Sequence, residues 1–180
     1  MSGPDGVVTV IDTVPAACAG VVARTLPKLL ADPANLVHRN DMLYGAYLAG
    51  AALTGGFALQ HAVAHMLGGS FGVEHGTAHA VMLPYVTAHL VRMAPEPLGR
   101  IAAALETDDP AGFIWDLVKA AGLPVRLADV GVHDLERAVE IAMTAEEHDE
   151  DNPAPVTEAA VREILEAAAR GDRPMRGERS

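Results

Sequence analysis

The sequence has little cysteine, little positive charge and few aromatic residues. A single cysteine, Cys18, excludes an internal disulfide framework and a cysteine-rich metal site. The 13 Lys and Arg residues are outnumbered by 24 Asp and Glu residues, and the net charge is −11. A nucleic-acid surface needs clustered basic residues, so this balance argues against a nucleic-acid partner. Aromatic residues make up only 4% of the chain, as expected where small aliphatic side chains pack between helices.

Targeting and membrane signals are also missing. Residues 1–12 do not show the basic and then apolar order of a leader, and no apolar run is long enough to span a bilayer. We therefore expect a cytoplasmic protein with no membrane segment. In contrast, 50% of the 180 residues are hydrophobic, which is enough for a sizeable core. A domain this apolar usually covers part of its surface, and we expect a homo-oligomer or a partner subunit.

Helical periodicity runs through the chain from Pro15 onwards and predicts an all-α helical bundle of about seven to eight helices. We expect an extended N-terminal arm at 1–14, one helical domain at 15–171 and a disordered tail at 172–180. Pro27 should kink or divide the first helix, and Asp32 should cap the second. The expected helices cover residues 16–30, 32–53, 57–67, 75–93, 97–105, 109–121, 134–145 and 157–169.

Eight histidines are present, and four of them form two closely spaced pairs. His61 and His65 are four residues apart on one expected helix, and His75 and His79 are four residues apart at the start of the next. A glycine-bearing loop separates the two helices and allows them to fold back on each other. The four imidazoles should then converge near this loop, in a spacing that suits Fe, Zn, Ni or Cu.

Other roles for these histidines remain open. They are either buried core histidines, metal ligands, or acid–base groups that work without a metal. Glu74 is the only carboxylate close to the two pairs, so a charge-balanced metal site is incomplete. His89 is expected to be structural or exposed, and a solvated surface position is expected for His38, His133 and His148.

Motifs of other common enzyme classes are absent from the sequence. It contains no dinucleotide-binding GxGxxG, no P-loop and no GxSxG nucleophile motif, and no histidine lies close to Cys18 in the sequence to activate it. The histidine pairs therefore carry the functional hypothesis.

The stretch GFALQHAVAHMLGGSFGVEHGTAHAVMLPYV (56–86) resembles the signature region of iron-containing alcohol dehydrogenases, and most closely their maleylacetate reductase branch. The resemblance extends from about Ala16 to Gly171. It implies the all-helical, dehydroquinate synthase-like C-terminal domain of that family. The shared features are His61-x3-His65, Leu67-Gly68-Gly69, His75-Gly76, His79 and Leu83-Pro84.

The resemblance also implies roles for individual histidines. His61 and His75 match two metal-ligand positions of the family, for a divalent metal such as Fe or Zn. His65 matches the histidine beside the nicotinamide and substrate, and His79 matches a position that the reductase branch also fills with histidine. We expect His65 and His79 to be catalytic. Substrates in that branch are small keto acids.

Two parts of the family's architecture have no counterpart in this sequence. One is the Rossmann-like domain that binds NAD(P), and the other is the helix that carries the remaining two metal-ligand positions. NAD(P) would therefore bind only if a partner chain supplied that domain, and no NAD(P)-binding residue is assigned here.

Three functions follow as hypotheses. The first is a non-redox enzyme in which the histidines transfer protons on a small carbonyl or enolisable substrate. The second is one subunit of a split NAD(P)H-dependent reductase that needs a nucleotide-binding partner. The third is a helical scaffold without catalytic activity.

Overall fold

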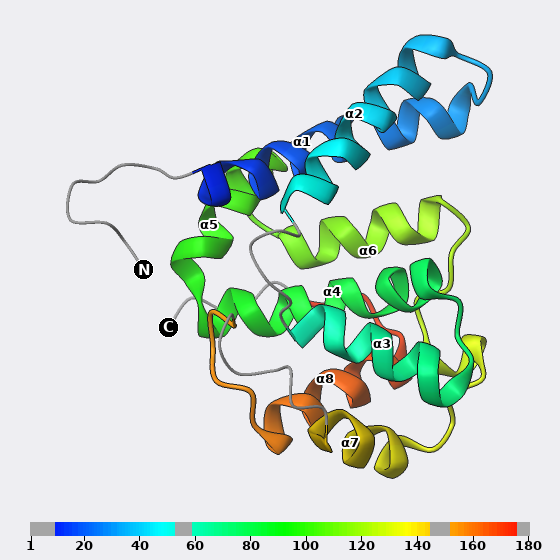
Figure 1. Cartoon of the computed structure of the whole chain (residues 1–180), viewed down its shortest axis with the longest axis vertical. Helices are drawn as coiled ribbons and strands as arrows, with labels where there is room; N and C mark the ends of the chain where they lie inside the picture. Colours follow the sequence, from blue (N-terminus) through cyan, green and yellow to red (C-terminus); the bar gives the residue numbers. More distant parts are fainter. Residues whose placement is uncertain (1–9, 53–58, 145–151, 176–180) are drawn as a thin grey trace. The chain divides into compact units, whose positions relative to one another are not determined.

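A computed structural model describes residues 10–52, 59–144 and 152–175. All regular secondary structure in these residues is helical, which confirms the predicted all-α class. None of these helices combines the length and hydropathy that a bilayer span demands. The elements are α1 (Val10–Ala31), α2 (Leu36–Ala52), α3 (Leu59–Phe71), α4 (His75–Met93), α5 (Pro95–Ala104), α6 (Pro110–Ala120), the 3₁₀ helix η2 (Leu127–Val130), α7 (Leu135–Thr144) and α8 (Glu158–Arg170) (Figure 1).

The contacts divide the chain into two compact units, and the single helical domain expected at 15–171 stays a prediction. Unit 1 comprises residues 1–56 and 100–107, and unit 2 comprises residues 57–99 and 108–180. The described part of unit 1 is built mainly on the packing of α1 against α2. The histidine pairs belong to unit 2.

In unit 1, α1 and α2 pack closely through a glycine. A Cβ atom at Gly45 would lie 3.0 Å from Val22 Cγ2, so the small residue allows close approach of the two helices. At the same contact the Cys18 thiol donates a hydrogen bond to Gly45 O over 3.4 Å.

Pro27 lies inside α1 without dividing it, and α1 already begins at Val10. Residues 10–14 of the expected extended arm are therefore helical, and residues 1–9 lie outside the described part.

The second helix begins later than the sequence predicts. Asp32 was expected as its N-cap, but residues 32–35 form a turn and α2 starts at Leu36. Asn35 is the capping residue, because its Oδ1 accepts hydrogen bonds from Val37 N over 3.0 Å and His38 N over 3.3 Å.

Unit 2 is organised around α4, which packs against α3, α6 and α8, while α7 packs against α8 and α3 (Figure 1). The core contains almost only aliphatic side chains, as expected from the low aromatic content. Burial of these side chains fixes α3 and α4 beside each other. The largest fully buried members are Leu67, Met82, Leu127, Leu165, Val63, Val81, Val86, Val132 and Val161.

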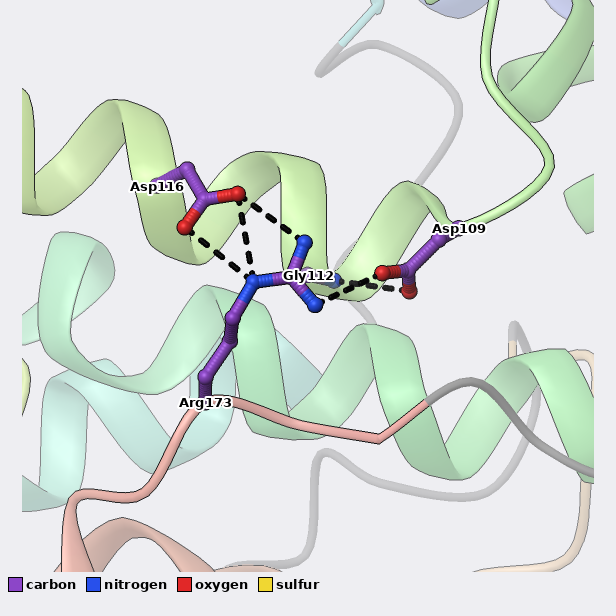
Figure 2. A network of polar contacts seen from close by, with 4 residues as sticks. All are labelled: Asp109, Gly112, Asp116 and Arg173. Carbon is purple, nitrogen blue, oxygen red and sulfur yellow. Dashed lines mark hydrogen bonds and ion pairs between the residues drawn. The ribbon is translucent and has the colours of Figure 1, made fainter.

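The segment after α8 is held by an ion-pair network, although the sequence predicts a disordered tail at 172–180. Arg173 Nη1 lies 2.8 Å from Asp109 Oδ2, and its Nη2 lies 2.9 Å from Asp116 Oδ2 (Figure 2). Asp109 also caps α6 by accepting a hydrogen bond from Gly112 N. One guanidinium thus joins residues 172–175 to α6. Residues 176–180 lie outside the described part.

Candidate functional site

The turn between α3 and α4 places the two histidine pairs next to each other. The sequence predicts that α3 ends at Gly68-Gly69, but the helix continues to Phe71. Gly72 ends it, because its φ of +69° is a left-handed conformation that glycine adopts without strain. Gly72 N donates to Gly68 O and Val73 N donates to Leu67 O, which closes the helix end. Only residues 72–74 separate α3 from α4.

Glu74 fixes the first turn of α4. Its carboxylate accepts hydrogen bonds from Gly76 N over 2.9 Å, from Thr77 N over 2.7 Å and from Thr77 Oγ1 over 2.9 Å. These donors, chiefly the two backbone amides, lower the pKa of the Glu74 carboxyl. The carboxylate that the sequence singled out near the histidines is therefore an N-cap, and it sets the helix start at His75.

The four imidazoles converge as the sequence predicts. We call His61, His65, His75 and His79 the histidine cluster. The His61 and His65 rings lie 4.4 Å apart between centroids, and those of His75 and His79 lie 4.6 Å apart. Between the two helices, the His61 ring lies 5.5 Å from His75 and 5.0 Å from His79, and the His65 ring lies 5.3 Å from His75. The cluster is thus formed by α3 and α4 alone.

Within the histidine cluster the rings differ in contacts and exposure. His61 Nε2 lies 2.8 Å from His65 Nε2, a distance that requires a hydrogen on one of the two nitrogens. His65 and His75 are exposed, whereas His61 and His79 are partly buried. Burial, followed by the nearby charges of His75, His61 and His65, lowers the pKa of His79 from 6.5 to about 4. His79 is therefore neutral at physiological pH.

The donor set of the histidine cluster fits a divalent transition metal. His61, His75 and His79 each present a ring nitrogen, and these three nitrogens all lie within 4.8 Å of one another. Neutral imidazole is a ligand that iron and zinc accept. Among the described residues no carboxylate joins this group.

Gln60 lies at the site, although the sequence alone did not predict it as a site residue. The amide Nε2 of Gln60 lies 3.1 Å from His79 O and 3.4 Å from His79 Nδ1. Its Oε1 atom is buried and has no hydrogen-bond partner among the described residues. The available signal was a polar side chain beside a candidate ligand in an otherwise apolar stretch of helix.

The remaining histidines lie apart from the histidine cluster in contacts and surroundings. His89 is 6% exposed on α4, and its Nδ1 lies 4.0 Å from Glu163 Oε2 on α8. Burial lowers the pKa of His89. His38 is partly buried rather than solvated, and His133 is exposed as expected. His148 lies outside the described residues.

The fold and the histidine cluster define a helical domain that brings imidazoles together from two adjacent helices. The chain belongs to the Fe-containing alcohol dehydrogenase family, since the model of that family's C-terminal domain matches residues 8–169. This confirms the resemblance seen in the sequence.

Individual relatives include maleylacetate reductases. Maleylacetate reductase 1 of Rhodococcus opacus is 36% identical over 168 residues, which is 92% of this chain and 46% of that protein. The maleylacetate reductase of Burkholderia cepacia is 38% identical over 85% of this chain and 44% of its own length. The chain therefore spans less than half the length of these two relatives.

Solved structures give the same result. The maleylacetate reductase of Rhizobium sp. strain MTP-10005 superimposes with a TM-score of 0.84 at 30% identity, over 94% of this chain and 48% of that one. An iron-containing alcohol dehydrogenase of Corynebacterium glutamicum gives a TM-score of 0.82 at 36% identity, over 90% of this chain and 46% of that one.

Proposed function

We propose that this chain is the metal-binding, substrate-activating part of a nicotinamide-dependent reductase that acts on a small keto acid. The observation that carries the proposal is the convergence of four imidazoles from α3 and α4 in a chain whose relatives include maleylacetate reductases. A cluster of this kind suits a reaction in which negative charge develops on a carbonyl oxygen.

The nicotinamide would be bound by residues other than these 180, either elsewhere on the same polypeptide or on a partner subunit. Two observations support this division. The relatives are about twice as long as the region they share with this chain. The 180 residues also contain no glycine-rich dinucleotide motif.

His61 and His75 would hold the metal, a divalent ion such as Fe or Zn. When bound, such an ion acts as a Lewis acid toward a carbonyl oxygen. The Glu74 cap supports this role, because its hydrogen bonds to the backbone fix the helix start from which His75 projects.

His65 is placed to move a proton. Reduction of a ketone adds a hydride to the carbonyl carbon and a proton to the carbonyl oxygen. The 2.8 Å contact between His65 Nε2 and His61 Nε2 requires one hydrogen between the two rings, and if His61 Nε2 bound the metal, that hydrogen would reside on His65. Since the His65 ring is exposed, it is the member of this pair from which a proton reaches a substrate.

The test is to produce the chain together with the unmatched N-terminal part of the Rhodococcus opacus reductase and to follow maleylacetate-dependent NADH oxidation. Activity should require the divalent metal and should be lost in His75→Ala. His65→Ala should retain the metal and lower kcat by about 10²–10⁴-fold. His133→Ala, which changes an exposed histidine away from the cluster, is the control. A metal-loaded complex that reduces no keto acid would contradict the proposal.

Proton transfer without redox chemistry is a second candidate function, because the hydrogen-bonded pair His61–His65 needs no cofactor for acid–base work. The chain alone, with EDTA present, would then exchange solvent deuterium into an enolisable keto acid such as pyruvate. Loss of that exchange in His65→Ala would support this function, and no exchange by the wild type would exclude it for that substrate. A scaffold role predicts instead that histidine substitutions alter thermal stability but no ligand binding.

A further inference from the structure

Geometry alone admits three metal ligands in the histidine cluster, His61, His75 and His79. The side chain of Gln60 on α3 affects whether His79 is available as the third ligand. Gln60 precedes His61 in the sequence, and its amide reaches across to α4, where it contacts both the backbone oxygen and the ring of His79.

The two contacts fix which end of the Gln60 amide faces His79. The carbonyl oxygen of His79 is only an acceptor, so the group 3.1 Å away from it must be the amide nitrogen. A flipped amide would place two carbonyl oxygens against each other at that distance. The same nitrogen lies 3.4 Å from His79 Nδ1. An NH₂ group has no lone pair to offer there, so a hydrogen bond across this contact has Nδ1 as its acceptor.

A neutral imidazole carries one hydrogen, and it resides on the nitrogen that is not accepting. With Nδ1 accepting from Gln60, the hydrogen of His79 is on Nε2. Neither nitrogen then has a free lone pair for a metal. Ligating histidines normally show the opposite arrangement, in which the second ring nitrogen donates to an oxygen acceptor.

We propose that Gln60 is a positioning residue that holds His79 in the Nε2–H form, and so keeps His79 out of the metal's ligand set and available as a hydrogen-bond donor at the site. The proposal rests on the proposed function only for the presence of a metal. It assigns His61 and His75 as the ligands from this chain, and it gives His79 a role toward the substrate oxygen.

The buried Oε1 of Gln60 agrees with this assignment. It has no hydrogen-bond partner among the described residues, so the amide is not oriented by its oxygen end. Within the described residues, the contacts with His79 are those that orient the amide.

The first experiment reads the tautomer directly, by long-range ¹H–¹⁵N NMR of the full chain labelled at histidine, in EDTA. His79→Gln assigns the His79 signals by their disappearance. The wild type should show the Nε2–H pattern for His79. Gln60→Glu replaces the donor by an acceptor and should convert His79 to the Nδ1–H form, whereas Gln60→Met, which removes the donor, should give a mixture. An Nδ1–H pattern in the wild type, or the same tautomer in all three proteins, would overturn the proposal.

The second experiment measures zinc affinity by calorimetry, with Zn²⁺ alone as the probe. Gln60→Glu should bind Zn²⁺ about tenfold or more tightly than the wild type, because the His79 lone pair becomes available. The added carboxylate also attracts cations, so the double variant Gln60→Glu/His79→Gln is the control. The gain should disappear in it, and a gain that persists without His79 would overturn the ligand assignment. Absence of zinc binding in every protein would refute the proposed function, while the NMR result would still decide the role of Gln60.

Discussion

The lowered pKa of His79 predicts a pH dependence of stability that one substitution should remove. In the folded chain this pKa is about 4, whereas an unfolded histidine has its ordinary value near 6.5. Between these two values the unfolded chain binds a proton at His79 and the folded chain does not. Stability must therefore fall as the pH decreases from about 6.5 to about 4, and the effect levels off below that range.

The size of the effect follows from the two pKa values. At about 1.4 kcal/mol per pKa unit, their difference corresponds to about 3 kcal/mol in the absence of screening. His79 is only partly buried, so solvent reduces the effect, and we expect about 1–2 kcal/mol. His79→Gln cannot bind a proton in this range. On acidification, the free energy of unfolding of the His79→Gln variant should therefore fall by about 1–2 kcal/mol less than that of the wild type.

The assay is urea unfolding at about pH 7.5 and about pH 4.5, with EDTA present and with linear extrapolation to water. His133→Gln is the matched control, since it removes an exposed histidine. The lowered pKa of buried His89 adds its own pH dependence, but this is common to all three proteins and cancels in the comparison. Equal pH dependence in the wild type and His79→Gln would refute the claim that burial and the neighbouring imidazoles keep His79 neutral.

Three further predictions concern stability and local order. Leu67→Ala, at a fully buried position of α3, should cost about 2–5 kcal/mol in urea unfolding, whereas Leu83→Ala at an exposed position of α4 should cost less than about 1 kcal/mol. Gly171→Ala should destabilise the chain by about 1 kcal/mol or more, because the φ of Gly171 is +75° and an added Cβ would lie 2.8 Å from Arg126 Cβ. Gly50→Ala should stabilise α2 by about 0.5–1 kcal/mol, because no atom lies near the position of the added Cβ. Thermal unfolding measures both changes. Arg173→Gln should accelerate hydrogen exchange of the amides at 171–175 and at Gly112, whereas Arg170→Gln should not.

The sequence predicted helix boundaries well where the capping residues were unambiguous. The predicted start and end of α4 at His75 and Met93 are confirmed, and the starts of α6 and α8 fall directly after Asp109 and Thr157, which cap them. In each case a side chain that accepts from the first turn stands directly before the helix.

Prediction failed where several residues of the right type compete. Asp32 and Asn35 both suit an N-cap, and the hydrogen bonds of Asn35 decide the start of α2. Gly68, Gly69 and Gly72 all suit a helix end, but only Gly72 has positive φ. Leu67 near the end of α3 is fully buried, and such burial is a tertiary effect that the local sequence pattern does not encode.

For the site, spacing alone predicted that two histidine pairs on adjacent helices would meet, and the structure brings the four rings together. The contact of Gln60 with His79 joins residues 19 apart, and it depends on the register of α3 against α4, which no local pattern encodes. The same holds for Arg173, whose carboxylate partners lie 57 and 64 residues earlier in the chain.

The central claim is that the histidine cluster binds a catalytic metal through His61 and His75. Calorimetric titration of the EDTA-treated chain with Zn²⁺ tests it most directly. We expect about one zinc ion per chain. This binding should be lost in His61→Ala and in His75→Ala and should be unchanged in His133→Ala. No saturable zinc site, or a site that persists in His75→Ala, would contradict it.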